Sequence, residues 1–272
     1  MRRLPTIGRP GRRSPLALAI ALILVGAGVG AYLYVRWRPS AVRLARLREY
    51  RADPAAHADW ALRTGDRCGD APFAFPTDGL VGFTWGDSFR PGYHHQGLDI
   101  FGPDDLGETP VRAAYDGYLT RLPSWHSAVI VRIPEDPLQH GRQIWTYYTH
   151  MADAEGQSFI DPAFPPGTTE RFVQAGTLLG HQGTYSADPL NPVGMHLHFS
   201  IVLDDGQGRF RNELEISNTL DPSPYFGFEL NAERLGDALA VCPSGGGGNG
   251  TSSKLDLARG EDARRDLSGG ES

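Results

Sequence analysis

Two histidines alternate with apolar residues in the stretch MHLHFSIV, residues 195–202. Successive side chains of a strand point to opposite faces, so Leu197 and Phe199 are expected to face a core. His196 and His198 then share the other face. Two histidines in this arrangement can bind one metal ion together, or one can bind the metal while the other transfers a proton. A polar strand face exposed to solvent is the alternative when this stretch is considered alone.

A second stretch, YHHQGLDIFG, places a histidine and an aspartate on one expected strand face. His95, Gly97 and Asp99 alternate there with apolar Leu98 and Ile100. Because glycine has no side chain, we expect an ion to lie in the space that Gly97 leaves between the imidazole and the carboxylate. Catalytic zinc sites often use three protein ligands drawn from His, Asp and Glu. The two alternating histidines of the first stretch are the expected source of the third ligand.

A further histidine lies near the end of the stretch WTYYTHM. If this stretch continues as a strand, His150 shares a face with Tyr148. Three expected strands then carry four histidines and one aspartate, which is more than one zinc ion needs. A histidine left unliganded beside an activated water is a candidate general acid or base.

The three stretches together resemble the signatures of a known family. HQGLD, YTHM and GMHLHFSI resemble the HxxxD, YxHL and HLHFE motifs of the M23 family of zinc metallopeptidases, the lysostaphin-like and LytM-like endopeptidases of bacterial cell walls. The resemblance covers residues 76–202. It includes TPVRAAYDGYLTRL, which resembles the strand pair entering the family's site, and VQAGTLLGHQGTYS, which resembles its VxxGxxIGxxGxTG segment.

The resemblance assigns roles to individual residues. It implies one zinc ion per domain, with the ligands His95, Asp99 and His198. It implies that His150 and His196 are the unliganded catalytic pair beside the attacking water, and it leaves open which of the two is the general acid and which the base. Tyr148 is a candidate for orienting these groups or supporting the oxyanion, with packing against a neighbouring strand as the alternative.

The chain also departs from the family pattern. Met195 replaces a proline that commonly precedes HLHF, and Ser200 replaces the glutamate that follows it. Two connections, residues 152–172 and 184–195, are longer than usual. Because both join strands that bear site histidines, we expect them to form walls of the substrate groove.

The implied function is a membrane-anchored zinc endopeptidase that hydrolyses peptide cross-links of bacterial peptidoglycan. The alternative is a catalytically silent module of the same family that docks on cell-wall or division proteins and activates another cell-wall hydrolase. Such modules typically lack one or more site residues, so the complete set here favours the enzyme. A zinc D-Ala-D-Ala peptidase of another fold is disfavoured by the strand-like HLHF.

The site residues lie in a region of short strands bounded by Gly, Pro and Asp, residues 67–243, where helical periodicity is scarce. We expect a mainly β domain, an antiparallel sheet whose long loops form a groove. Residues 36–66 are basic and loosely periodic, and predict a stalk that spaces the domain from a membrane. Residues 244–272 are rich in Gly, Ser and charge, and predict a disordered tail.

The 20 residues from Leu16 to Val35 carry no charge and are long enough to cross a bilayer as a helix. They predict a transmembrane anchor over residues 15–35, with a cleaved signal peptide as the alternative. A short basic N-terminus, residues 1–14, is expected to stay in the cytoplasm. The chain is therefore expected to cross the cytoplasmic membrane once, with its C-terminal domain outside.

Charge and cysteine content limit the partners and the compartment. Residues 1–51 hold 11 of the 26 basic residues and one acidic residue, which leaves residues 52–272 with a net charge of −16. A domain of this charge repels nucleic acid. The two cysteines, Cys68 and Cys242, bracket the domain and are candidates for a disulfide in an oxidising compartment, with two free thiols as the alternative.

Overall fold

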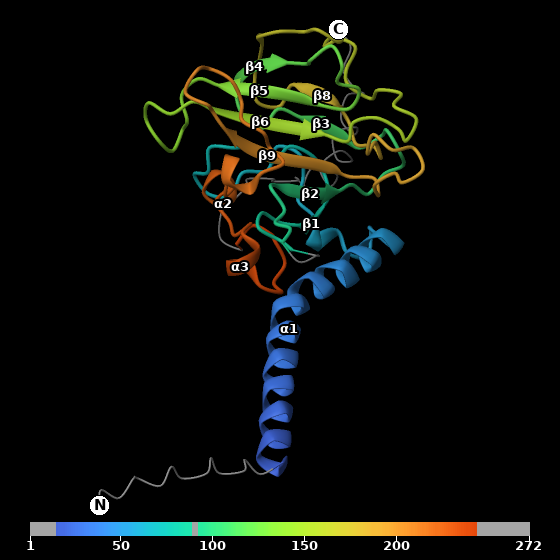
Figure 1. Ribbon diagram of the computed structural model, residues 1–272. Helices are drawn as coiled ribbons and strands as arrows, with labels where there is room; N and C mark the ends of the chain where they lie inside the picture. The colour runs from blue at the N-terminus through green and yellow to red at the C-terminus, as the bar shows by residue number, and fades with distance from the viewer. Residues whose placement is uncertain (1–14, 89–91, 244–272) are drawn as a thin grey trace, which may run out of the picture.

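The computed structural model describes residues 15–88 and 92–243 (Figure 1). The N-terminal segment 1–14 and the predicted disordered tail 244–272 lie outside the described residues. Along the chain the elements are α1 (Pro15–Ala52), η1 (Ala58–Trp60), β1 (Leu80–Phe83), β2 (Leu98–Phe101), β3 (Pro110–Arg112), β4 (Gly117–Thr120), β5 (Val129–Ile133), β6 (Ile144–Thr149), β7 (Arg171–Val173), β8 (Leu178–His181), β9 (Leu197–Leu203), η2 (Ile216–Asn218), β10 (Thr219–Leu220), α2 (Ser223–Phe226) and α3 (Ala232–Leu235).

The expectation of a mainly antiparallel β fold is confirmed. The main sheet has the strand order β1-β2-β9-β6-β5-β4-β7, with β10 beside β9, and β3 and β8 form a second, two-stranded sheet. Every pairing between these strands is antiparallel. Strand β9, which carries the MHLHFSIV pattern, lies between β2 and β6. The three motifs, which are far apart in sequence, are therefore brought onto adjacent strands.

The core lies on one face of the main sheet. Leu98, Leu197, Phe199 and Ile201 are each no more than 1% exposed and belong to one apolar cluster. Val111 of β3 belongs to the same cluster, so the small sheet covers this core. The alternation expected in β9 therefore holds on its apolar side. The opposite side is also buried: His198, Ser200 and Val202 are at most 7% exposed, and Trp125 and Phe210 pack against the apolar cluster that contains Val202.

Helix α1 has two parts with different surroundings. Figure 1 shows its first part projecting from the domain and the helix bending where it reaches the domain. Pro39 lies inside the helix, and proline removes a backbone hydrogen bond and bends helices. Beyond it, Arg43, Leu47 and Tyr50 are buried. Part of the region predicted to be a stalk is thus a helix that packs one face against the domain.

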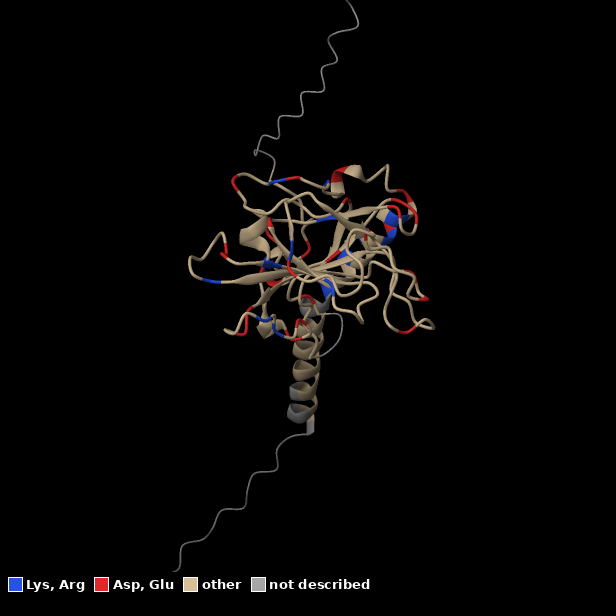
Figure 2. Cartoon of the chain, turned by 90° about the horizontal axis from the view of Figure 1, so that it is seen from above, with Lys and Arg blue, Asp and Glu red and all other residues tan. Residues whose placement is uncertain are grey.

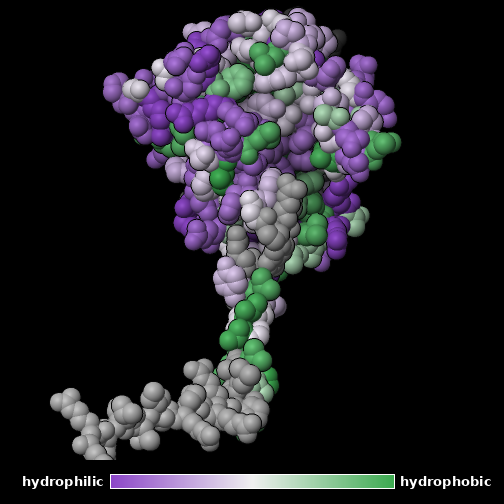
Figure 3. Space-filling view, viewed as in Figure 1, coloured by the Kyte–Doolittle hydropathy of each residue, from purple (hydrophilic) through white to green (hydrophobic). Residues whose placement is uncertain are grey.

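The first part of α1 exposes a row of apolar side chains (Figure 3). Among them are Leu16, Ile20, Leu22, Ile23, Leu24, Val25, Val29 and Leu33. By hydropathy, no helix of the described residues reaches the length and apolarity of a membrane span. The side chains of residues 15, 17, 18, 21 and 35 within the predicted anchor lie outside the described part.

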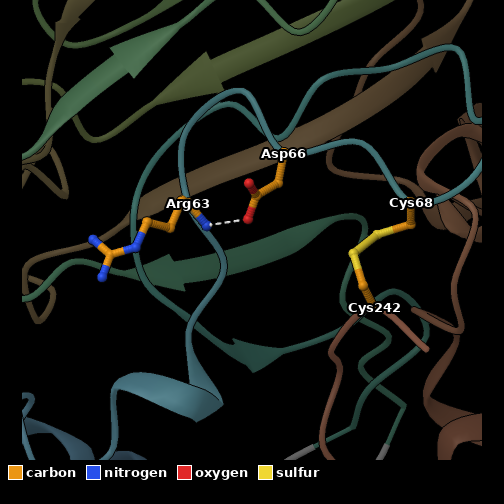
Figure 4. The surroundings of a disulfide bond; sticks show 4 residues. All are labelled: Arg63, Asp66, Cys68 and Cys242. Atoms are coloured by element: carbon orange, nitrogen blue, oxygen red, sulfur yellow. Dashed lines mark hydrogen bonds between the residues drawn. A yellow bond between two sulfur atoms is a disulfide. The ribbon is translucent and has the colours of Figure 1, made fainter. Parts of the chain in front are cut away.

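Cys68 and Cys242, which are 174 positions apart in sequence, form a disulfide (Figure 4). The turn just before Cys68 is closed by a hydrogen bond from the Arg63 amide to an Asp66 carboxylate oxygen, 2.8 Å long. The disulfide joins the beginning of the domain to its last described residues. Acidic residues lie on many of the loops around the domain (Figure 2).

Candidate metal centre

Strands β2 and β9 bring three potential metal ligands together. Asp99 and His198 are directly opposite each other in the antiparallel pair, and His95 lies just before β2. His95 Nε2 is 3.0 Å from Asp99 Oδ1 and 3.1 Å from His198 Nδ1, and the latter two atoms are 2.9 Å apart. Within the part of the chain that the structure describes, this is the group of His, Cys, Asp and Glu side chains with the spacing of a metal site.

The donor set suits zinc. Two ligand atoms at roughly 2.0–2.1 Å from a tetrahedral zinc are about 3.3 Å apart, which is close to the three distances observed here. Two imidazole nitrogens and one carboxylate oxygen form the ligand set of a catalytic site with one open position. Asp99 also suits this role. Burial raises the pKa of its carboxyl, but His95 and His196 lower this pKa by more, and the net pKa is well below the usual value. Asp99 is thus an anionic ligand.

The imidazole of His95 is oriented by the backbone. Its Nδ1 lies 3.1 Å from the Thr84 carbonyl oxygen. A carbonyl oxygen can only accept, so Nδ1 carries the proton and donates it. The Nε2 lone pair is then free to face the other two ligand atoms, which is the arrangement that metal-binding histidines usually show.

Glu213 is a site residue that sequence reasoning missed. Its Oε2 lies 3.7 Å from His198 Nε2, on the side of the ring away from the ligand atom Nδ1. Both of these atoms are buried, and neither has a hydrogen-bond partner. Burial lowers the pKa of His198, but the hydrogen bond with Asp99 and the nearby carboxylate of Glu213 outweigh this effect and raise the pKa to about 10. Glu213 comes from the loop after β9, and no motif marks it.

The two remaining histidines lie beside the ligand cluster. The ring centroids of His150 and His196 are 4.6 Å apart, and His196 Nε2 is 3.4 Å from Asp99 Oδ1. His196 Nδ1 lies 2.5 Å from the Gly194 carbonyl oxygen, and His150 Nδ1 lies 2.6 Å from the Tyr185 carbonyl oxygen. Each Nδ1 therefore donates its proton to the backbone, which leaves each Nε2 as a proton acceptor.

His150 reaches this position because the strand ends before it. Strand β6 stops at Thr149, and His150 has a φ of 71°, in the left-handed region. This conformation turns the imidazole to the face of His196 instead of the face of Tyr148, where a continued strand would place it. It costs a non-glycine residue about 1 kcal/mol or more. Burial, with His196 and His198 nearby, lowers the pKa of His150 to about 3, so it is neutral at physiological pH.

The interpretation of Gly97 was wrong. A Cβ at this position would lie 2.1 Å from the Phe199 carbonyl oxygen and 2.9 Å from Ser200 Cβ. The space that glycine leaves is filled by the backbone of β9, which leaves no room for an ion there. Glycine is needed here because β2 and β9 approach closely, which is also what brings Asp99 opposite His198.

Tyr148 does not support the site. Its side chain is fully buried, and its ring lies 5.3 Å from that of Phe199 within the main core. Its hydroxyl oxygen accepts a hydrogen bond from the Ala114 amide, 2.9 Å long. The proposed orienting or oxyanion role is therefore wrong, and the alternative of packing in the sheet is correct.

A groove with a volume of ≈ 550 Å³ opens beside His150. The connection 184–195 contributes Tyr185, Ser186 and Ala187 to its lining, as expected. No residue of 152–172 lines it among the described residues. That connection instead packs inward, with Ile160 and Phe164 in the core. The remaining walls come from Trp125 and His126 on one side and from Phe210, Arg211 and Glu213 on the other.

No family model matches the sequence, and no curated protein matches it. Solved structures that resemble it include Csd3 of Helicobacter pylori, which is 19% identical with a TM-score of 0.35 over 57% of this chain and 34% of that chain. A protein described as an M23 peptidase from Pseudomonas aeruginosa is 20% identical, with a TM-score of 0.34 over 68% and 62%. A mutant catalytic domain of the prophage-encoded M23 protein EnpA from Enterococcus faecalis is 22% identical, with a TM-score of 0.31 over 53% and 94%.

Proposed function

We propose that this protein is a zinc metalloendopeptidase that hydrolyses peptide cross-links of bacterial peptidoglycan. The observation that carries the proposal is the convergence of His95 Nε2, Asp99 Oδ1 and His198 Nδ1 to within 3.1 Å of one another. Two further histidines, His150 and His196, lie beside them, each with its Nδ1 hydrogen-bonded to a backbone carbonyl oxygen. The motifs HQGLD, YTHM and GMHLHFSI, which resemble those of cell-wall endopeptidases, support the choice of substrate.

The zinc ligands and the two other histidines have different roles in this reaction. When bound by the three ligands, zinc supplies Lewis-acid polarisation of the scissile carbonyl and activation of a water molecule. His150 and His196 are placed to accept a proton at Nε2 and to return it to the leaving amine. Because the pKa of His150 is about 3, this residue is a neutral proton acceptor or hydrogen-bond partner near neutral pH.

The groove beside His150 supports an extended peptide as the substrate. Its lining combines the aromatic residues Trp125, Tyr147 and Phe210 with the polar residues Thr149 and Asn212. Concave sites with apolar walls and a few polar groups are typical of ligand-binding clefts. A peptide lying in this groove would pass His150, whose ring centroid is 6.1 Å from that of ligand His198.

We further propose that α1 anchors the protein in the cytoplasmic membrane, with the domain outside. The projecting first part of α1 exposes apolar side chains, and the Cys68–Cys242 disulfide suits an oxidising compartment. Peptidoglycan would then lie within reach of the groove. Association with other cell-wall or division proteins is a further expectation from this location.

The proposal is tested by measuring the zinc content of the full chain in detergent, with His198→Ala as the ligand variant. We expect about one zinc per wild-type chain, and loss of both zinc and muropeptide hydrolysis in the variant. His94→Ala is the matched control, because His94 is next to ligand His95 in sequence but is exposed. Hydrolysis by metal-free His198→Ala would refute the proposal. Zinc binding without turnover, together with activation of a partner hydrolase, would favour the silent module.

A further inference from the structure

A buried ion pair joins α1 to the loop before β2. Arg43 and Asp87 are 4% and 2% exposed. Arg43 Nε lies 2.8 Å from Asp87 Oδ2, and its Nη2 lies 2.8 Å from Asp87 Oδ1, so the guanidinium contacts both carboxylate oxygens. Ser40 Oγ also donates to Asp87 Oδ1, at 2.6 Å. Two-pronged pairs of this kind fix the relative orientation of the two segments as well as their distance.

The same loop holds the metal ligand His95. The His95 amide donates to the Asp87 carbonyl oxygen, and the Gly86 amide donates to the His95 carbonyl oxygen, each at 2.8 Å. The Thr84 carbonyl oxygen, which orients the His95 imidazole, also accepts a hydrogen bond from the Asp87 amide at 3.1 Å. Asp87 thus connects Arg43 of the helix to both the backbone and the ring of His95.

A second set of contacts connects α1 to His196. Leu47 and Tyr50 form an apolar cluster with Leu80 and Phe101. The Phe101 ring stacks on the His196 ring, with centroids 4.9 Å apart and an interplanar angle of 23°. This set is independent of the ion pair, because it uses apolar packing and reaches a different histidine.

A third contact involves the residue that accepts the hydrogen bond of His196. A Cβ built on Gly194 would lie 2.9 Å from an Arg51 guanidinium nitrogen, so the end of α1 borders this residue. The Gly194 carbonyl oxygen accepts the hydrogen bond from His196 Nδ1. Residues 40–51 of the helix therefore border the supports of His95 and of His196.

We propose that residues 40–51 of α1 position the metal site, so that docking of this helix and binding of the metal are coupled. The inference rests on the proposed zinc site and extends it to a segment outside the motifs HQGLD, YTHM and GMHLHFSI. Loss of the docked helix would release the supports of one ligand and one acid–base histidine together. Because such coupling is reciprocal, the bound metal must also stabilise the docked helix.

The first experiment measures zinc affinity of the full chain in detergent by competition with a chromophoric chelator. We expect Arg43→Met to weaken zinc binding by roughly tenfold or more, the range found for groups that orient metal ligands. Arg43→Lys keeps the charge without the two-pronged contact, so it should restore part of the affinity. Circular dichroism on the same samples shows whether each variant is folded.

Arg38→Met is the matched control on the same helix. Arg38 forms an ion pair with Asp237 at 3.1 Å, with side chains 56% and 45% exposed. This substitution removes an arginine without touching the supports of the site, so zinc affinity should not change. Wild-type affinity in a folded Arg43→Met variant would overturn the inference and leave the proposed function intact. A wild-type chain that binds no zinc would overturn both.

Hydrogen exchange of the unmodified protein tests the reciprocal effect and does not depend on a variant folding. We expect zinc to slow amide exchange in residues 40–51. Residues 134–143, which connect the ends of β5 and β6 remote from the site, should show no change and serve as the internal control. Unchanged exchange in residues 40–51 on zinc binding would refute the coupling.

Discussion

The pKa of His198 leads to a quantitative prediction for zinc binding. Its pKa is about 10 in the metal-free protein because the hydrogen bond with Asp99 and the nearby carboxylate of Glu213 outweigh the effect of burial. Zinc requires a deprotonated ligand nitrogen. Binding near neutral pH should therefore release about one proton from His198. His150, with a pKa of about 3, is already neutral and should release none.

The size of this effect follows from the pKa. At pH 7.5 the solution is about 2.5 pH units below the pKa of His198, and each unit corresponds to 1.36 kcal/mol. Deprotonation therefore opposes zinc binding by roughly 3 kcal/mol, and zinc affinity should rise about tenfold per pH unit up to about pH 10.

Folding stability depends on pH in the direction opposite to that of zinc affinity. The folded-state pKa of His198 is above the unfolded value of 6.5. The stabilisation that protonated His198 gives to the fold is therefore fully present below pH 6.5 and is lost as pH rises through about 10. The metal-free protein should thus become less stable over the range in which zinc affinity increases. The increase in Tm caused by zinc should grow accordingly.

Calorimetric titration of zinc in buffers of different ionisation enthalpy counts the released protons. At pH 9 we expect about 0.9 proton from His198 in the wild type. In Glu213→Gln the removal of the carboxylate lowers the pKa of His198, so fewer protons should be released. Protons from sources that both proteins share cancel in the comparison. Equal proton release by the two proteins at pH 9 would refute the reasoning.

Three variants test the structural roles of Tyr148, Gly97 and the disulfide. Tyr148→Phe leaves a buried amide without its acceptor and should destabilise the fold by about 1–3 kcal/mol in urea unfolding, with zinc affinity unchanged; a large loss of kcat alone would restore the catalytic role. Gly97→Ala forces a Cβ against the β9 backbone and should lower stability by about 3 kcal/mol or more and abolish zinc binding, whereas a stable zinc-binding variant would contradict the close-approach explanation. Replacing Cys68 and Cys242 by Ser should reduce stability by about 5 kcal/mol at most, because the bond closes a long loop, and an unchanged Tm would argue against it.

The parts of the site that could be predicted are those with simple strand periodicity. His196 and His198 alternate with apolar residues on β9, and Asp99 lies on the adjacent strand, so period-two reasoning and the motif spacing identify them. The antiparallel fold class follows from the same patterns. Register between β2 and β9, which aligns Asp99 with His198, required the structure.

Other features depend on local departures from that periodicity. His150 joins the site through a positive φ that strand alternation does not predict, because a continued strand would place it on the face of Tyr148. Glu213 comes from an irregular loop. The packing face of α1 was missed because its buried positions, 43, 47 and 50, begin with an arginine, which a hydrophobic pattern counts as exposed. The buried partner that neutralises Arg43 is 44 residues away in sequence.

The most direct test of the proposed activity is mass spectrometry of muropeptides after digestion of peptidoglycan with the full chain, with and without a metal chelator. We predict that the wild type releases products of amide-bond hydrolysis within the peptide cross-links, that chelation stops this release, and that added zinc restores it. His198→Ala should release none. Unchanged products in the presence of chelator, or no cleavage of any cross-link by the zinc-loaded wild type, would contradict the account.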